Sequence, residues 1–534
     1  MHSEEIRMIL GIDFGTCYST AAIMNGLIPV TTFMKNDTTG MGIPSLFMYS
    51  EEDNMEKFGE DCVTGQAFRH PNDVVRYMKR TVRESSDNLS KYVVSGGKEY
   101  TIQQIIEKYL AYLISEVKSA AIRSGEYKNT NIEAVTITVP VGISSGQMMA
   151  SDYNRFIRDT VMKITGLGED RVRVLQEPVA AAISYLYSED IRTHYDENTT
   201  AVVFDLSGGT LDITVVEHNP KTMEYTIMAK EGDLQLGGND WDLKLREAIL
   251  EKLGIEWSGS DEESQLFDKA VTELKMKLSA SEESIIFFTM NDEDKFVKIS
   301  REEFEGCTSE LLDRAMEVLT KAIESDTLPE SFHPDRIVLV GGSSNMPQIY
   351  NAIVDMDIVD KDNVMLFEPS KAIAKGAAVH AKMNFSNDGC AKGPKVIDMA
   401  TLTYGFDSCY NSERDCIYNM IYKGEKFDEN GMIVRTSNTC FVPLRDDQTT
   451  VSFEIYESEA VKGEGFEENW YDYDDDMNFN GLKVTVQVPP EFLGKATAFR
   501  MWVTITLDEN GILTITILDR MGNKLAYGSS DFRA

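Results

Sequence analysis

The stretch that decides the fold is Val202-Val203-Phe204-Asp205-Leu206-Ser207-Gly208-Gly209-Thr210-Leu211-Asp212-Ile213-Thr214-Val215-Val216. Its two apolar runs are rich in β-branched residues and predict two strands. The Ser-Gly-Gly turn between them predicts a very short hairpin in which glycine supplies a positive φ. Such a turn can aim backbone N–H groups at an anion, and Asp205 and Asp212 beside it can hold a cation that neutralises the anion. An ordinary hairpin with acidic ends is the alternative interpretation.

A second copy of the pattern lies near the N-terminus, in Ile9-Leu10-Gly11-Ile12-Asp13-Phe14-Gly15-Thr16-Cys17-Tyr18-Ser19-Thr20-Ala21-Ala22-Ile23. Again an apolar strand ends in Asp, and a Gly-Thr turn leads into another strand. We interpret the two hairpins as an internal duplication whose turns face each other across a cleft. A third glycine turn, Gly341-Gly342-Ser343, follows the apolar run Ile337–Val340. None of the three turns fits a Walker or Rossmann pattern.

These three turns resemble the phosphate-1, phosphate-2 and adenosine motifs of the actin-like ATPases. Three further segments resemble the seventy-kilodalton heat-shock chaperones of the DnaK family: Ala134–Pro140, Leu175–Ala182 and Gly232–Asp242. The resemblance runs in order over nearly the whole chain. It implies an α/β two-lobed actin-like ATPase domain, duplicated and ribonuclease-H-like, followed by an all-β peptide-binding sandwich.

The resemblance also implies a site for ATP and Mg²⁺. Val74–Thr81 resembles the family segment that carries a catalytic lysine, which would be Lys79, although a Lys-Arg pair is usually solvated surface. The catalytic residues implied are Lys79, Glu177, Asp205 and Thr210, and Asp13 and Asp205 would hold Mg²⁺ through water. The nucleotide-binding residues implied are Asp13, Gly15, Thr16, Cys17, Tyr18, Ser207, Gly208, Gly209, Thr210, Asp212, Gly237, Gly238, Lys275, Ser279, Gly341, Gly342 and Ser343.

Several positions depart from the family pattern. Thr272 and Ser370 replace acidic residues, and Met276 and Asn345 replace arginines. The base and ribose are therefore expected to be held more loosely than in the family, with phosphate contacts dominating. Ser207 stands where the family has glycine, and a positive φ there would cost on the order of 1 kcal/mol.

Composition narrows the choice of partners. The 534 residues include 52 Lys plus Arg against 88 Asp plus Glu, a formal charge of -36, which disfavours nucleic acid and anionic membranes. The 7 cysteines form no Cys-x-x-Cys pair and the chain has only 6 histidines, so a zinc site is not expected. The cysteines are expected to be reduced thiols in a cytoplasmic protein. No secretory signal is apparent, and no apolar run approaches the ~20 residues of a membrane span.

We predict an ATPase domain over residues 1–385, a linker over 386–398 and a β-sandwich over 399–534. The linker is punctuated by Gly and Pro, and a surface loop within one domain is the alternative. It keeps Asp398 of the family pattern, but Pro394–Ile397 replaces a run of leucines. The family's helical lid is expected to be missing. Within the first lobe, a capping box at Thr101 predicts a helix whose core side is formed by Ile102, Ile105, Ile106, Tyr109, Leu110, Leu113, Ile114 and Val117.

The C-terminal module shows short alternating runs and a hairpin turn at Asp508–Gly511. By the family match, its peptide cleft would be lined by Phe406, Phe441, Leu444, Val451 and Phe453; for each of the aromatic and valine positions the sandwich core is an equal alternative. The acidic segment Glu467–Asp476 is expected to be a solvated loop, with calcium binding as a weaker alternative.

The function implied is that of an ATP-dependent chaperone for unfolded or extended polypeptides, working with a J-domain protein and a nucleotide-exchange factor. A sugar kinase or another non-chaperone ATPase of the superfamily is one alternative, against which the β-module argues. A regulatory or interaction protein that binds ATP with little turnover is the other, kept open by the departures around the adenosine and in the linker.

Overall fold

The computed structural model describes residues 8–25, 28–31, 40–63, 70–84, 89–124, 131–140, 150–188, 198–222, 224–329, 331–385, 395–411, 414–428, 431–473, 477–508 and 511–530. They fall into two compact units. The first holds most of the chain up to Lys395, and the second holds the residues from Val396 onward with two short earlier segments. The domain boundaries drawn from the sequence stay a prediction, and residues 386–394 of the linker lie outside the described residues.

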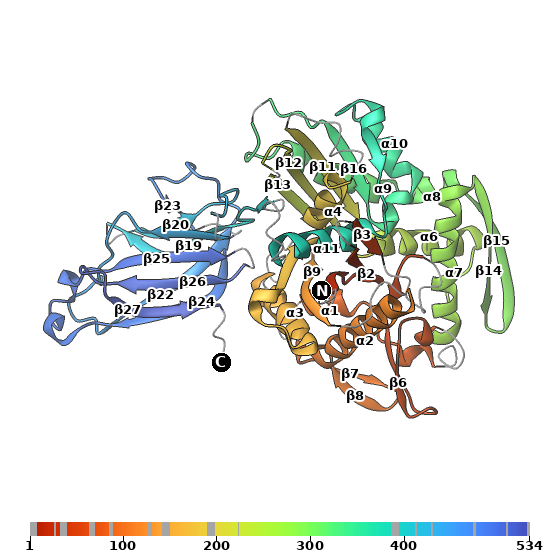
Figure 1. The fold of residues 1–534 in the computed structure, drawn as a ribbon, viewed down its shortest axis with the longest axis horizontal. Coiled ribbons are helices and arrows are strands. Elements are labelled where there is room, and N and C mark those ends of the chain that lie inside the picture. The colour runs from red at the N-terminus through yellow and green to blue at the C-terminus, as the bar shows by residue number, and fades with distance from the viewer. Residues whose placement is uncertain are drawn as a thin grey trace, which may run out of the picture. The chain divides into compact units, whose positions relative to one another are not determined.

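The first sheet of the first unit is built around the N-terminal hairpin (Figure 1). Its strand order is β10 (Val172–Gln176), β9 (Ile132–Val139), β1 (Met8–Asp13), β2 (Tyr18–Asn25) and β3 (Ile28–Thr31), and β4 (Ile43–Pro44) also pairs with β2. The hairpin strands β1 and β2 are antiparallel, whereas β1, β9 and β10 are parallel. Asp13 therefore ends a central strand, where its carboxylate faces the turn into β2.

The second sheet repeats this arrangement. Its order is β17 (Val364–Leu366), β16 (Arg336–Val340), β11 (Thr199–Leu206), β12 (Leu211–Asn219), β13 (Glu224–Asp233) and, at the edge, β18 (Lys395–Ile397). The hairpin β11–β12 is antiparallel, and β11, β16 and β17 are parallel. Strand order and direction match those of the first sheet, as the predicted duplication requires.

Two equivalent helices, α4 (Glu177–Leu186) and α11 (Ala372–Phe385), each follow the last parallel strand of a sheet and pack on one another. Helix α11 covers β1, β2 and β9, and α4 lies on β11 and β12. Small residues make this close approach possible: a Cβ on Gly376 would stand 1.7 Å from the Ala180 carbonyl oxygen. Figure 1 shows both helices between the hairpin strands. This packing holds the two aspartate-bearing turns in one place.

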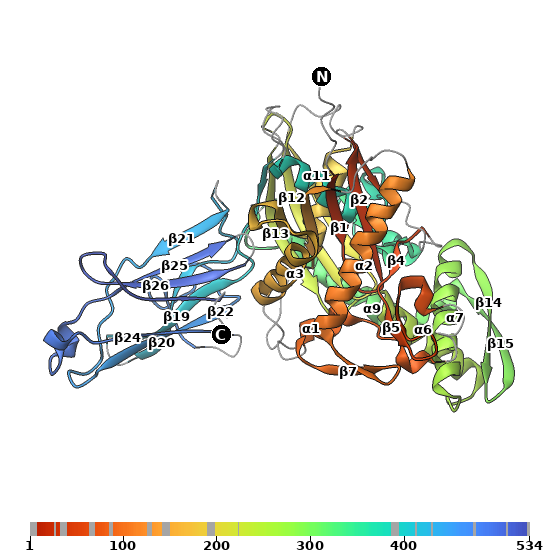
Figure 2. The ribbon, with the colours of Figure 1, turned by 60° about the horizontal axis from the view of Figure 1, so that its bottom comes forward.

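The remaining elements of this unit cover the sheets and form its periphery. They are the helices α1 (Met78–Glu84), α2 (Ile102–Arg123), α3 (Ala150–Thr165), α6 (Gly238–Leu253), α7 (Asp261–Ala280), α8 (Arg301–Cys307), α9 (Ser309–Ile323) and α10 (Pro347–Asp355), and the hairpins β5 (Phe47–Ser50) with β6 (Met55–Phe58), β7 (Tyr92–Ser95) with β8 (Lys98–Thr101), and β14 (Glu283–Met290) with β15 (Glu293–Ser300). Figure 2 shows α7 beside the β14–β15 hairpin.

Helix α2 illustrates how local sequence sets an element. The Gln104 N–H donates to Thr101 Oγ1 at 3.1 Å, and Thr101 N–H donates to Gln104 Oε1 at 2.9 Å, so the predicted capping box is confirmed. All eight apolar positions predicted to form its core side are buried. No described helix is long and apolar enough to cross a membrane.

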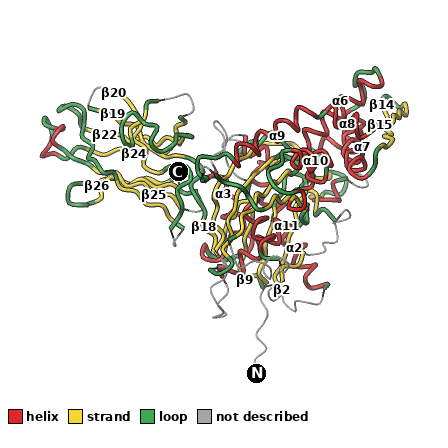
Figure 3. The backbone as a smooth tube through the Cα atoms, turned by 90° about the horizontal axis from the view of Figure 1, so that it is seen from above, coloured by secondary structure: helices red, strands yellow, loops and turns green. Residues whose placement is uncertain are grey.

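The second unit is a sandwich of two antiparallel sheets with two short 3-10 helices, Pro490–Phe492 and Ala496–Ala498 (Figure 3). One sheet has the order β23 (Trp470–Tyr471), β20 (Arg414–Ile421), β19 (Thr403–Tyr410), β22 (Thr450–Ser458) and β24 (Asn478–Gln487); the other has β21 (Met432–Thr436), β25 (Trp502–Asp508), β26 (Leu513–Leu518) and β27 (Lys524–Ser529). The predicted all-β module and the hairpin that joins β25 to β26 are confirmed. The expectation of a solvated loop at Glu467–Asp476 is wrong for Trp470 and Tyr471, which form a strand.

Candidate functional site

The two duplicated turns touch each other. A Cβ on Gly208 would stand 2.6 Å from Cys17 Sγ, and a Cβ on Gly209 would stand 2.9 Å from Thr16 Oγ1. Neither glycine has a positive φ, and neither does Ser207. The expectation that the turn needs a positive φ is therefore wrong, and Ser207 carries no strain of that kind. Glycine is required here because the first turn leaves no room for a side chain.

The second turn also rests on the start of helix α6. The N–H groups of Gly238 and Asn239 donate to the carbonyl oxygens of Ser207 and Gly208 at 2.9 and 2.8 Å. A Cβ on Gly237 would stand 2.4 Å from the carbonyl carbon of Gly209. The second turn is thus the point where the first turn and α6 meet.

The third glycine turn closes on the same place. Gly341 has a φ of 81°, and a Cβ there would stand 2.4 Å from Asp205 Oδ1. Ser343 Oγ would lie 2.1 Å from a Cβ on Gly238. Among the glycines of the three predicted turns, Gly341 alone has a positive φ, a backbone conformation that favours glycine over other residues.

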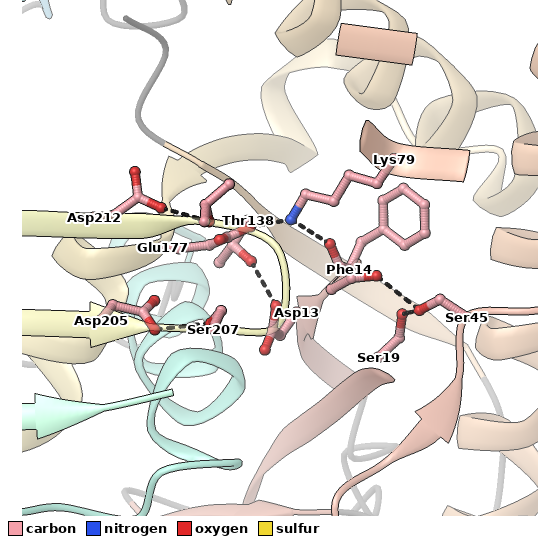
Figure 4. A network of polar contacts seen from close by, with 12 residues as sticks. Asp13, Phe14, Ser19, Ser45, Lys79, Thr138, Glu177, Asp205, Ser207 and Asp212 are labelled. Carbon is pink, nitrogen blue, oxygen red and sulfur yellow. Dashed lines mark hydrogen bonds and ion pairs between the residues drawn. The ribbon is translucent and has the colours of Figure 1, made fainter. Parts of the chain in front are cut away.

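An ion pair lies beside the first turn. Lys79, on α1, and Glu177, the first residue of α4, form an ion pair with side chains that are both 4% exposed. The Lys79 Nζ also donates to the Phe14 carbonyl oxygen at 2.6 Å. Figure 4 shows the lysine reaching over Phe14 toward Glu177. The two residues predicted to be catalytic are therefore in contact, at the turn that follows Asp13.

Carboxylates crowd the space between the two turns (Figure 4). Burial, reinforced by the charge of Glu177, raises the pKa of Asp13 to about 7, although Lys79 lowers it. Burial and the charges of Glu177 and Asp212 also raise the pKa of Asp205 well above its usual value. Both shifts share the same two causes, first the removal of the carboxyl from water by burial and second the negative charge of Glu177.

Hydrogen bonds satisfy these carboxylates only in part. Ser207 Oγ donates to Asp205 Oδ1 at 2.8 Å, and Thr210 Oγ1 donates to Asp212 Oδ2 at 3.0 Å. Asp205 Oδ2 is buried and accepts no hydrogen bond from the described residues. The excess negative charge and this buried oxygen fit a divalent cation. In the described ranges, no three His, Cys, Asp or Glu side chains are arranged to ligate a metal directly.

On the side predicted to face the adenosine, the chain binds its own side chains. Lys275 Nζ donates to the Gly238 carbonyl oxygen at 2.6 Å and lies 2.9 Å from Asp242 Oδ1. Thr272 Oγ1 donates to Asp242 Oδ2 at 3.0 Å, and Ser279 Oγ donates to the Lys275 carbonyl oxygen at 3.3 Å. The Lys275 ammonium thus lies near Ser343 and α6 but is already paired.

Other predicted positions occupy the rim of the site. The Gly15 carbonyl oxygen accepts a hydrogen bond from Ser45 Oγ at 2.7 Å, and burial raises the pKa of Tyr18. A Cβ on Gly342 would be 3.4 Å from Met41 Cε. Met276 is 47% exposed on α7.

Sequence reasoning missed two contributions to the site. Asp242 was given no role from the sequence, although this residue ends the segment Gly232–Asp242. The reason is that Asp242 pairs with Lys275, which lies 33 positions further along the chain on another helix. The Phe14 carbonyl oxygen was missed as well, because a backbone acceptor leaves no trace in residue type. At Ser207 the expected cost concerned a positive φ, whereas the structure shows its hydroxyl donating to one oxygen of Asp205, Oδ1.

The family model described as "Hsp70 protein" matches residues 9–526. The chain belongs to the Hsp70 family. The DnaK chaperone of Halobacterium salinarum is 27% identical over 536 residues, covering 97% of this chain and 74% of that protein. The DnaK chaperone of Anaplasma marginale is 25% identical over 544 residues, covering 97% of this chain and 75% of that protein.

The peptide-binding positions expected in an Hsp70 sandwich lie differently from the prediction. Phe406, Phe441 and Phe453 are 0%, 8% and 3% exposed and belong to the sandwich core. Val451 packs against that core, and Leu444 is exposed. The expectation that all five side chains line an open cleft is therefore corrected: the three aromatic rings fill the space between the sheets, which was the alternative interpretation.

Proposed function

We propose that this Hsp70-family chain is an ATP-dependent chaperone that hydrolyses ATP in its first unit and binds extended apolar polypeptide in its sandwich. The observation that carries the ATPase half is the contact of Lys79 with Glu177 and the Phe14 carbonyl oxygen, beside the turns that carry Asp13 and Asp205. A lysine buried among carboxylates offers a positive charge where a γ-phosphate would need one.

The residues divide the work by their chemistry. Thr16, Thr210 and the N–H groups of their turns hold phosphate oxygens. Asp13 and Asp205 hold Mg²⁺ through water, and the ion neutralises phosphate charge when bound. Lys79 and Glu177 orient the attacking water, which is a task of position and charge more than of covalent chemistry. The raised pKa of Asp13 means that binding of the cation at neutral pH releases a proton from this carboxyl.

The adenosine side supports weaker recognition. Lys275 is paired with Asp242 and Met276 points outward, so we propose that the phosphates contribute most of the nucleotide affinity. The polypeptide half of the proposal is supported by the family relationship and by the two-sheet sandwich of the second unit.

A steady-state ATPase assay with and without an unfolded apolar peptide tests the proposal. Turnover that depends on Mg²⁺ and rises with peptide is the expected result. Turnover that peptide leaves unchanged would indicate a non-chaperone ATPase, and nucleotide binding without turnover would indicate a regulatory protein. Lys361→Ala, which changes an exposed lysine outside the site, is the matched control for Lys79→Ala.

A further inference from the structure

A short segment of the sandwich pairs with a strand that would otherwise be an edge. Strand β23 adds to β20 in antiparallel register, with Trp470 opposite Tyr418 and Tyr471 opposite Ile417. The Asn419 N–H donates to the Asn469 carbonyl oxygen at 2.8 Å. In Figure 1, β23 is the outermost strand beside β20. Only two residues pair, so the backbone contribution to holding this segment is small.

Two side chains anchor the segment: Tyr471 is 6% exposed and its Oη donates to the Val461 carbonyl oxygen at 2.7 Å, and Trp470 packs its indole on aromatic rings. The indole ring lies 4.9 Å from Tyr418, 5.1 Å from Tyr410 and 6.0 Å from Phe441. Phe441 in turn lies 4.8 Å from Phe406. Trp470 therefore covers Tyr410, Tyr418 and Phe441, of which Phe441 is a position that the family resemblance assigns to peptide binding.

Both ends of the segment are tied to one arginine. Arg414 lies over the Phe466 ring at 3.6 Å, and its Nε donates to Asp472 Oδ1 at 2.7 Å. Arg414 and Asp472 are both exposed, so water screens this pair and it contributes little to stability. Asn469, between the two ends, has a φ of 63°, a conformation that costs an ordinary residue free energy.

These contacts have the form of strand addition. In that mode, backbone hydrogen bonds to a sheet edge supply affinity, and a pocket for an alternate side chain supplies specificity. A tryptophan against clustered aromatic rings is the anchor most often found at the centre of such interfaces. The chain's own segment thus shows which ligand the β20 edge accepts: an aromatic side chain, followed two residues later by a carboxylate at Arg414.

We propose that the edge of β20, with the rings of Tyr410, Tyr418 and Phe441 and with Arg414, is a polypeptide-binding site whose resident occupant is Phe466–Asp472. A client segment with an aromatic residue and a carboxylate two positions on displaces the occupant. The inference rests on the proposed binding of polypeptide by the sandwich and names the surface that does it. Because the occupant is tethered, it competes at an effective concentration on the order of millimolar, and it lowers the apparent affinity for clients.

The test measures binding of a fluorescein-labelled peptide with the sequence of residues 465–473, by anisotropy, to the full-length chain. The variants are Trp470→Ala, which removes the indole anchor of the occupant, and Tyr473→Ala as the matched control. Tyr473 is 45% exposed, follows the occupant directly and contacts Tyr456 instead of the rings of Tyr410, Tyr418 and Phe441. A second probe peptide carries alanine in place of its tryptophan.

Trp470→Ala is expected to bind the probe at least about tenfold more tightly than the unaltered chain or Tyr473→Ala. This factor corresponds to an occupant that fills the site in about 90% of the unaltered molecules and leaves it open in the rest. The probe peptide with alanine in place of tryptophan is expected not to bind the unaltered chain, Trp470→Ala or Tyr473→Ala. Asp472→Asn loosens the occupant without touching the rings and leaves Arg414 free for the carboxylate of the probe, so it is expected to tighten binding as well. This variant keeps the test decisive if Trp470→Ala does not fold.

Each other outcome has a distinct meaning. Equal or weaker binding of the probe by folded Trp470→Ala and Asp472→Asn, with an unfolded apolar peptide still bound, would overturn the β20 site and leave the proposed function intact. Failure of every variant to bind any peptide would overturn the proposed polypeptide binding itself.

Discussion

Replacing Lys79 by alanine tests the nucleotide site most directly. The substitution removes the ammonium group that contacts Glu177 and the Phe14 carbonyl oxygen, and it leaves Glu177 buried with its charge uncompensated. Breaking a buried ion pair from one side costs about 3–5 kcal/mol. We expect the free energy of unfolding of the nucleotide-free protein to fall by that amount, and Glu177→Gln in the same chain to restore much of it because the stranded charge is gone.

Hydrolysis is expected to respond differently from stability. Loss of one group that stabilises charge in the transition state lowers the rate by about 10²–10³-fold, or about 2.7–4 kcal/mol. The double variant Lys79→Ala/Glu177→Gln should recover stability but not hydrolysis. Lys79 also lowers the pKa of Asp13, so its removal raises this pKa above about 7 and weakens Mg²⁺ binding at neutral pH.

The assay is single-turnover hydrolysis of ATP already bound, with binding measured separately by calorimetry and stability by denaturant unfolding. Lys361→Ala should match the unaltered chain in all three. A folded Lys79→Ala variant that binds ATP and hydrolyses it at the unaltered rate would refute the role of Lys79. Loss of stability without loss of rate would show that the ion pair is structural only.

Three further predictions concern the frame around the site. Burial lowers the pKa of His380 from 6.5 to about 4, so below pH 6.5 the unfolded chain takes up a proton before the folded chain does. The free energy of unfolding should therefore fall by up to about 3 kcal/mol between pH 6.5 and pH 4. Urea titrations should find that this dependence of stability on pH is reduced in His380→Gln. Gly341→Ala should destabilise the fold and weaken nucleotide binding far more than Gly494→Ala, because both have a positive φ but only Gly341 faces Asp205 at 2.4 Å; equal thermal shifts in the two variants would contradict this. Thr101→Ala removes the N-cap of α2 and should cost about 1 kcal/mol in chemical denaturation, with nucleotide affinity unchanged.

Local sequence was sufficient for elements whose causes are local. The capping box and apolar stripe of α2 depend on residues within one or two turns of a helix, and the hairpins β1–β2, β11–β12 and β25–β26 depend on adjacent strands. The duplication was readable for the same reason, because each copy carries its own strand, aspartate and glycine turn. Lys79 and Glu177 were named together only through the family resemblance, since 98 positions separate them.

What sequence reasoning got wrong depends on distant packing. Glycines in the second turn were expected to serve a positive φ, but they serve the close approach of Thr16, Cys17 and Gly237, which no local pattern encodes. The alternating apolar residues of β22, among them Phe453, suit either a cleft or a core. Only packing against the opposing sheet places the Phe453 side chain in the core.

The sequence by itself determined the order of the elements, the paired aspartate turns and the all-β character of the C-terminal module, because periodicity and turn chemistry act over a few residues. The tertiary structure alone decided which charges meet and which rings are covered. The pKa values of Asp13 and Asp205 are raised because packing buries both carboxyls and because α4 brings the charge of Glu177 near them, and Trp470 covers Phe441 because β23 pairs with β20. Buried charge and strand pairing depend on distances in space, which the order of residues along the chain does not state.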